Sequence, residues 1–221
     1  DHNSDLACPN RDFHSDHVVN LRQTFMHLVR CHPNQFGLMT KRHDRVKELL
    51  FKLLQDTLLA NDAILPTAAA ALEIVVQQAT DTTREIKADI VVRTNAQQHN
   101  EMRLVFDVSI VEPTNRHGCT SVRGSAAAHQ ERAKLDLYRP VADADASTTI
   151  IPFVLESNGF VGTQASKFLT SLVDKGNSGT KKRIQSFLAD VSYGLAKDTG
   201  WAATRARKAA VSHQLAPPPA E

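Results

Sequence analysis

Two aspartates interrupt apolar segments in the first half of the chain. Asp89 lies in IKADIVV (86–92) and Asp107 lies in MRLVFDVSIV (102–111). Burying a carboxylate within a β-sheet is costly unless it is paired or binds a metal ion. Two aspartates on adjacent strands can hold Mg²⁺ or Mn²⁺, which would activate water and stabilise charge on a scissile phosphate. The alternative is one aspartate exposed at a sheet edge and the other in a structural ion pair.

A lysine and a tyrosine follow in SAAAHQERAKLDLY (125–138), a segment that predicts a helix. Polar side chains at every fourth position share one helical face, namely Gln130, Lys134 and Tyr138. Lys134 can orient the attacking water or neutralise the phosphate, and Tyr138 can position it. Leu135 and Leu137 are expected to face the core. The alternative role for Lys134 is a solvated side chain beside Glu131.

Histidines and cysteines gather in residues 1–38, a composition that suits a zinc site. His27 and Cys31 are four residues apart, a suitable spacing for two zinc ligands, and Cys8 is a candidate third ligand. His14 or His17 can complete the set. A metal-free remnant and loose surface histidines remain the alternatives.

Apolar spacing predicts the elements that must position these side chains. A helix is expected from residues 42–44 to about 60, with Thr40 or Asp44 as its cap. A short helical turn should then lead into a strand at about 72–78. The remaining expectations are strands 86–92 and 102–111, helix 125–138 ended by Pro140, strand 148–155 with Pro152 at a bulge or edge, and helices 163–174 and 179–196. The order α-β-β-β-α-β-α-α implies an α/β fold, with a mixed sheet and helices on both faces.

Composition indicates an ordinary globular protein but does not identify its function. The 221 residues are 42% hydrophobic and 23% charged, with a net charge of +2. That charge is too near zero to indicate nucleic acid by itself, and the basic residues 181–183 only permit it. No apolar run approaches the roughly 20 residues of a membrane span, so no membrane partner is expected. Three cysteines do not form a disulfide framework, which favours a reducing, intracellular compartment. Asp1 rather than Met begins the chain, as expected of a fragment or processed product.

The order of four motifs carries a family resemblance. ADIVV, FDVSIVEP, AAAHQERAKLDLY and IIPFVLESNGFVG follow one another between residues 88 and 162. Together they resemble the restriction-endonuclease-like, PD-(D/E)XK domain at the C-terminal end of many non-LTR retrotransposon reverse transcriptase polyproteins. HLVRC and RHDRVKELL, upstream, are similar to the segment that precedes this domain. The resemblance covers roughly residues 25–172.

The resemblance implies a degenerate zinc knuckle at residues 1–38 and an α-β-β-β-α-β nuclease core at residues 39–175. The sequence pattern predicts a C-terminal helix and a basic, proline-ending tail at 176–221. It places the catalytic metal ligands at Asp89 and Asp107, the displaced lysine at Lys134 and its tyrosine at Tyr138. Ser109 stands where the commoner pattern has lysine, and Ala88 where it has proline. Glu48, Glu73 and Glu156 are candidates for further acids of the site. Glu73 and Glu48 are favoured, whereas capping or bridging near Gly159 is the favoured role of Glu156. In the triplet at 42–44, capping is the expected role of His43 and a phosphate contact from Arg42 is the alternative.

Three functions therefore remain open. The first is a Mg²⁺- or Mn²⁺-dependent DNA endonuclease domain that nicks a target site, with nuclear access and RNA as a further partner in a retroelement complex. The second is a catalytically inactive nucleic-acid-binding module on the same fold. The third is a structural or partner-binding α/β domain.

Overall fold

A computed structural model describes residues 32–59, 68–77, 85–94, 102–113 and 122–214. His43–Gly194 form one compact unit, and the described parts of Asp1–Arg42 and Leu195–Glu221 form another. The candidate site lies within the first of these units. In the described ranges, no helix combines the length and apolarity that a membrane span requires.

The described elements have the order expected from the sequence, so the α/β class is confirmed. In chain order they are α2 (His32–Leu54), a π-helical turn η2 (Gln55–Leu59), β1 (Ala68–Gln77), β2 (Ile86–Thr94), β3 (Arg103–Val111), α3 (Ser125–Ala144), β4 (Thr148–Glu156), α4 (Thr163–Lys175) and α5 (Ser178–Gln214).

The strands form a mixed sheet in the order β1-β2-β3-β4. β1 and β2 are antiparallel, as are β2 and β3, while β4 runs parallel to β3. Parallel neighbours need a crossover, and α3 supplies it. β4 lies at an edge of the described sheet, which confirms the edge position expected for Pro152, a residue without an N–H for a further ladder.

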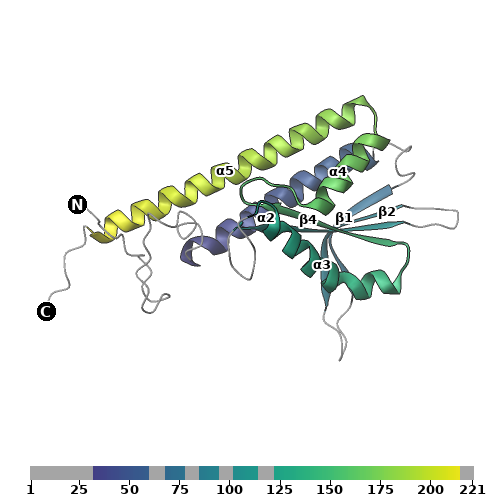
Figure 1. The fold of residues 1–221 in the computed structure, drawn as a ribbon, viewed down its shortest axis with the longest axis horizontal. Coiled ribbons are helices and arrows are strands. Elements are labelled where there is room, and N and C mark those ends of the chain that lie inside the picture. Colours follow the sequence, from purple (N-terminus) through teal and green to yellow (C-terminus); the bar gives the residue numbers. More distant parts are fainter. Residues whose placement is uncertain (1–31, 60–67, 78–84, 95–101, 114–121, 215–221) are drawn as a thin grey trace. The chain divides into compact units, whose positions relative to one another are not determined.

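Helices cover both faces of the sheet, as Figure 1 shows for α3 and α4. Toward α3, Val105 of β3 packs in a buried cluster with Tyr138. Toward α4, Phe106 meets Phe168 edge to face, with ring centroids 4.9 Å apart. Because β3 also has a strand on each side, its residues from Leu104 to Ile110 are all buried. Successive side chains of β3 thus point to opposite faces of the sheet, with Val105 toward α3 and Phe106 toward α4.

The start of α2 differs from the expectation. The helix begins at His32 instead of near Arg42, so neither Thr40 nor Asp44 is its cap and His43 lies inside it. Pro33 explains this start, because proline is well tolerated in a first helical turn, where its missing N–H has no intrahelical partner. Leu38 also extends the apolar spacing that continues at Val46.

The start of β1 also differs. The segment 68–71 was expected to be a turn of helix because alanine has the highest helix propensity. Instead these four alanines pair with residues 91–94 of β2. A ready-made antiparallel partner stabilises the extended form, and tertiary pairing outweighs a preference of a few tenths of a kcal/mol per residue.

Two expectations about α3 were wrong. Pro140 does not end the helix, which continues to Ala144. The extra turn buries Val141 beside Tyr138, and this burial offsets the backbone hydrogen bond that proline removes. Leu135 and Leu137 are 37% and 42% exposed because they lie on the two flanks of the buried face, which is centred on residues 127, 131, 138 and 141.

The last helix is longer than expected. α5 reaches Gln214 instead of ending near residue 196. Its continuation is rich in alanine, lysine and arginine, all of which have high helix propensity, and no proline occurs in it before Pro217.

Candidate functional site

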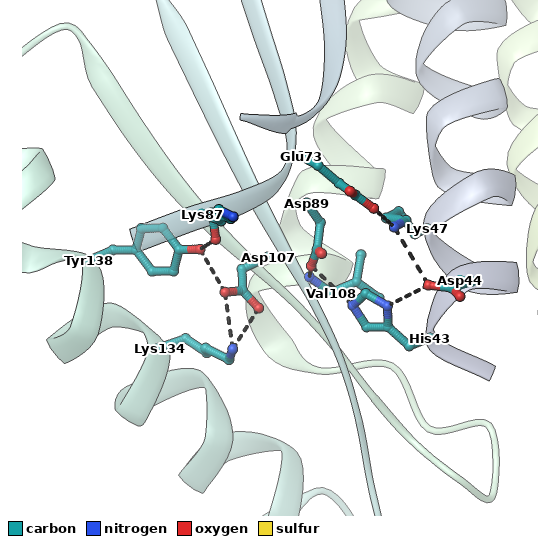
Figure 2. A network of polar contacts seen from close by, with 10 residues as sticks. All are labelled: His43, Asp44, Lys47, Glu73, Lys87, Asp89, Asp107, Val108, Lys134 and Tyr138. Atoms are coloured by element: carbon teal, nitrogen blue, oxygen red, sulfur yellow. Dashed lines mark hydrogen bonds and ion pairs between the residues drawn. The ribbon is translucent and has the colours of Figure 1, made fainter. Parts of the chain in front are cut away.

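Asp107 lies in the middle of β3 with Lys134 and Tyr138 of α3 directed at its carboxylate, as Figure 2 shows. The Lys134 ammonium is 2.8 Å from Oδ1 and 3.0 Å from Oδ2. The Tyr138 hydroxyl is 2.8 Å from Oδ2. The four-residue spacing thus does place Lys134 and Tyr138 on one helical face, and that face meets the second aspartate.

Asp107 is only 5% exposed, so these contacts replace the water that a carboxylate would otherwise require. Burial raises the pKa of Tyr138 far above its ordinary value, and the charge of Asp107 raises it further. The phenol is therefore neutral and acts as a hydrogen-bond donor. Its single hydrogen has two acceptors within reach, because the Lys87 carbonyl oxygen is 2.7 Å away.

Asp89 lies on β2, and its Oδ2 atom has two contacts of a different kind. It accepts the backbone N–H of Val108 at 2.7 Å. It also lies 3.2 Å from Nε2 of His43 on α2. The hydrogen bond with Asp89 raises the pKa of His43, and burial of the imidazole only partly opposes this. Asp89 thereby ties β2 to β3 and to α2.

Both aspartates lie where the regular pairing of β2 with β3 ends. Regular pairing between these strands runs from Arg93↔Arg103 to Ile90↔Phe106. At the next position of each strand stand Asp89 and Asp107. Side chains bind the backbone groups beyond this point, since Asp89 accepts from Val108 and Tyr138 donates to Lys87. Figure 2 shows the two carboxylates on neighbouring strands, each with its own set of partners.

A polar network on α2 continues from His43. Its Nδ1 atom is 3.2 Å from Asp44 Oδ1. The Lys47 ammonium lies 3.5 Å from the same Asp44 oxygen and 2.5 Å from Glu73 Oε1 on β1. Lys47 is buried, so two acidic neighbours stabilise its charge. Glu73 was expected from the sequence, whereas its ion pair with Lys47 and the hydrogen bond between His43 and Asp89 were not. Each of these contacts joins segments far apart in the chain.

Glu73 has an unusual backbone. Its φ angle is 53°, in the left-handed region that residues other than glycine seldom adopt. Its neighbours Leu72 and Ile74 pair with Ile90 and Ala88, so Glu73 stands opposite Asp89. Such strain costs on the order of 1–3 kcal/mol and persists only where surrounding contacts hold it. Here the ion pair with Lys47 and the flanking strand pairs do so.

The other candidate acids have different places. Glu48 is exposed on α2. Glu156 is fully buried at the end of β4, where Oε1 accepts the N–H of Ala127 in the first turn of α3 at 3.4 Å. Its Oε2 accepts from Asn158 at 3.3 Å, next to Gly159. Glu156 therefore bridges to Asn158 near Gly159, as expected, and also binds the first turn of α3.

One buried acid was overlooked as a candidate. Glu131 of α3 is 5% exposed, and its Oε1 accepts the N–H of Gln164 in the first turn of α4 at 2.8 Å. Burial raises the pKa of Glu131, although this backbone hydrogen bond opposes the rise. The spacing was the available signal. Glu131 follows Ala127 by four residues, so both lie on the same face of α3, and that face is buried. Glu131 and Glu156 each satisfy amides at a helix N-terminus, which is a structural role.

Cys8, His27 and Cys31, the candidate zinc ligands, lie outside the described residues, as do His14 and His17. Among the described residues, no group of three or more His, Cys, Asp and Glu side chains is arranged to hold a metal ion.

Comparisons of the sequence with known proteins do not identify a relative. No model of a known protein family matches the chain, and no curated protein matches it either.

Proposed function

We propose that this chain carries a divalent-metal-dependent DNA endonuclease domain of the PD-(D/E)XK, restriction-endonuclease-like type. It would hydrolyse a phosphodiester bond, with Asp89 and Asp107 as metal ligands, Lys134 as the assisting cation and Tyr138 in support. One observation carries the proposal. Asp89 and Asp107 lie where the regular pairing of β2 with β3 ends. Lys134 and Tyr138, from the crossover helix α3, both contact the carboxylate of Asp107.

The architecture supports the proposal. The described elements follow the α-β-β-β-α-β order that the resembled retroelement nuclease domains have, with a mixed sheet between helices. The lysine is on α3 and not two residues after the second acid, where Ser109 is found, yet its ammonium is 2.8 Å from Asp107. A displaced lysine thus reaches the carboxylate that it would assist. A retroelement origin would also imply target-site nicking, nuclear access and an associated RNA.

The donor set fits Mg²⁺ or Mn²⁺. These hard cations are bound by one or two carboxylates, with water and phosphate oxygens completing the coordination. Asp89 and Asp107 offer two carboxylates, and Asp89 Oδ2 is oriented by the Val108 amide and His43. A bound metal ion would activate water and neutralise charge that develops on the phosphate.

The residues of the chain have distinct tasks in this reaction. Tyr138 keeps its proton, because its pKa lies far above neutrality, so it orients Asp107 and is not a general base. Lys134 is positively charged and provides donors for an anionic phosphate oxygen. His43 fixes the position of the Asp89 carboxylate from α2.

Nicking of supercoiled plasmid DNA tests the proposal. Wild type should nick in Mg²⁺ or Mn²⁺ and not in EDTA, and Asp107→Asn should abolish nicking while retaining DNA binding. Asp143→Asn is the matched control, because Asp143 is exposed on α3. Its activity should equal that of wild type. Equal nicking by the Asp107 and Asp143 variants would refute the assignment of Asp107.

A second candidate, a catalytically inactive nucleic-acid-binding module, is favoured by a different observation. Lys134 and Tyr138 already satisfy Asp107, and a backbone amide satisfies Asp89, so both carboxylates are stable without metal. This candidate predicts salt-dependent DNA binding without nicking. Loss of both nicking and DNA binding would instead favour a structural or partner-binding domain.

A further inference from the structure

Lys134 contacts both oxygens of the Asp107 carboxylate. Its ammonium lies 2.8 Å from Oδ1 and 3.0 Å from Oδ2. Figure 2 marks both contacts with dashed lines. The side chain of Asp107 is 8% exposed, whereas that of Lys134 is 22% exposed. The buried anion is thus neutralised by a cation that retains access to water and can move away.

We propose that Lys134 is a built-in competitor of the divalent metal at Asp107, so that metal binding and release of Lys134 are one exchange. This inference rests on the proposed function, because it takes Asp107 to be a metal ligand. It assigns Lys134 two successive partners. Before metal binds, Lys134 neutralises Asp107, and after the exchange it is available to phosphate.

The divalent metal ion and the Lys134 ammonium exclude each other from the Asp107 carboxylate because both are positively charged. A Mg²⁺ ligand oxygen lies about 2.0–2.1 Å from the ion, so an ammonium on the same carboxylate would stand only a few ångströms from a double positive charge. Like charges at that separation repel strongly where water is excluded. Asp107 is buried, so solvent would screen this repulsion poorly. The ammonium must therefore leave both oxygens.

Tyr138 differs from Lys134 in this exchange. Its hydroxyl is neutral, lies at 2.8 Å from Oδ2 and comes from a side chain with no exposed surface. It carries no charge that would repel a cation, and it has no open path along which to move. Tyr138 therefore orients the carboxylate before and after the exchange. Lys134, once displaced, has three N–H donors for the oxygens of the substrate phosphate.

Calorimetric titration of the full chain with Mn²⁺ tests the exchange without relying on activity. The variants are Lys134→Met, which removes the competing charge, and Asp107→Asn, which removes the ligand. Lys87→Met is the matched control, because Lys87 is on the neighbouring strand, 62% exposed, and pairs with Glu85 at 3.2 Å. It removes the same charge without freeing Asp107.

Lys134→Met should bind Mn²⁺ about tenfold or more tightly than wild type, since a close opposite charge shifts a carboxylate equilibrium by about 1–3 log units. Lys87→Met should change the affinity by less than about fivefold, as an exposed charge does in water. Without metal, Lys134→Met should melt at a lower temperature than wild type, and saturating Mn²⁺ should raise its Tm by more. If Lys134→Met does not fold without metal, Lys134→Gln gives the same comparison with an amide donor retained.

The outcomes separate this inference from the proposed function. Equal or weaker Mn²⁺ affinity in Lys134→Met would overturn the exchange; if Asp107→Asn alone loses binding, the metal site itself still stands. Binding by Lys134→Met but not by wild type would support the exchange in its strongest form. Absence of Mn²⁺ binding in wild type, Lys134→Met and Lys134→Gln alike would overturn both the exchange and the metal-dependent nuclease.

Discussion

The hydroxyl of Tyr138 should contribute to stability far more than that of the other tyrosine in the chain. Tyr138→Phe removes one oxygen and leaves the ring in its cluster with Val105 and Val141. The lost hydroxyl lies 2.8 Å from Asp107 and 2.7 Å from the Lys87 carbonyl oxygen. The substitution therefore removes the single O–H hydrogen that lies within reach of both acceptors, and no cavity of consequence forms.

The size of the effect follows from the charge and burial of Asp107. A hydrogen bond to a charged group is worth about 1.5–3 kcal/mol, and a buried group left without its partner costs about 1–3 kcal/mol. Lys134 still contacts Oδ2 at 3.0 Å and limits the loss. We expect a decrease of about 2 kcal/mol in the free energy of unfolding, which corresponds to a Tm lower by about 4–8 °C for a chain of this size.

Urea unfolding at pH 7 measures this loss. The midpoint should fall in Tyr138→Phe while the denaturant slope stays the same, because the surface exposed on unfolding hardly changes. Tyr193→Phe is the control, since Tyr193 is 70% exposed, and it should alter stability by less than about 0.5 kcal/mol. In an Asp107→Asn background, the loss caused by Tyr138→Phe should shrink. Equal stabilities of the two phenylalanine variants would refute the hydrogen bond.

Two other changes give clear expectations. The pKa of His43 is raised above 6.5 in the folded protein by Asp89, so its stabilisation is complete below pH 6.5 and is lost as pH rises through the raised value. Wild type should therefore lose stability relative to His43→Gln over that interval, and parallel urea midpoints across pH 5–9 would contradict this. Gly162→Ala would place a methyl group against Glu131 and 3.0 Å from a backbone oxygen, and should cost about 1–3 kcal/mol in urea unfolding. At Gly200, inside α5, an added Cβ would meet no described atom within 4 Å beyond its own turn of helix, so Gly200→Ala should be neutral or stabilising. An equal loss there would exclude the clash as the cause.

Local patterns were sufficient to predict the order of the elements. Each strand is an apolar run, and an aspartate inside such a run is visible without any knowledge of its neighbours. The helical face shared by Lys134 and Tyr138 was also predictable, because four-residue spacing fixes it. The contact of that face with Asp107 depends on α3 being the crossover from β3 to β4, which the sequence predicted only through the element order.

The errors arose where distant partners decide the outcome. Residues 68–71 form a strand because β2 lies beside them, and α3 continues past Pro140 because Val141 has a cluster to join. The same holds within the site. His43 and Asp89 are 46 positions apart, and Lys47 and Glu73 are 26 apart. No spacing rule relates residues on different elements, so these pairs could not be predicted from one sequence.

The crossover geometry also bears on how the two aspartates acquire their partners during folding. Lys134 and Tyr138 lie 27 and 31 positions from Asp107, and all three belong to the single unit β3-α3-β4. Asp89 reaches His43 only after α2 has docked across a separation of 46 positions. Short loops close at lower entropic cost. The contacts of Asp107 therefore all lie within β3-α3-β4, whereas the contact of Asp89 with His43 requires α2 to pack against the sheet.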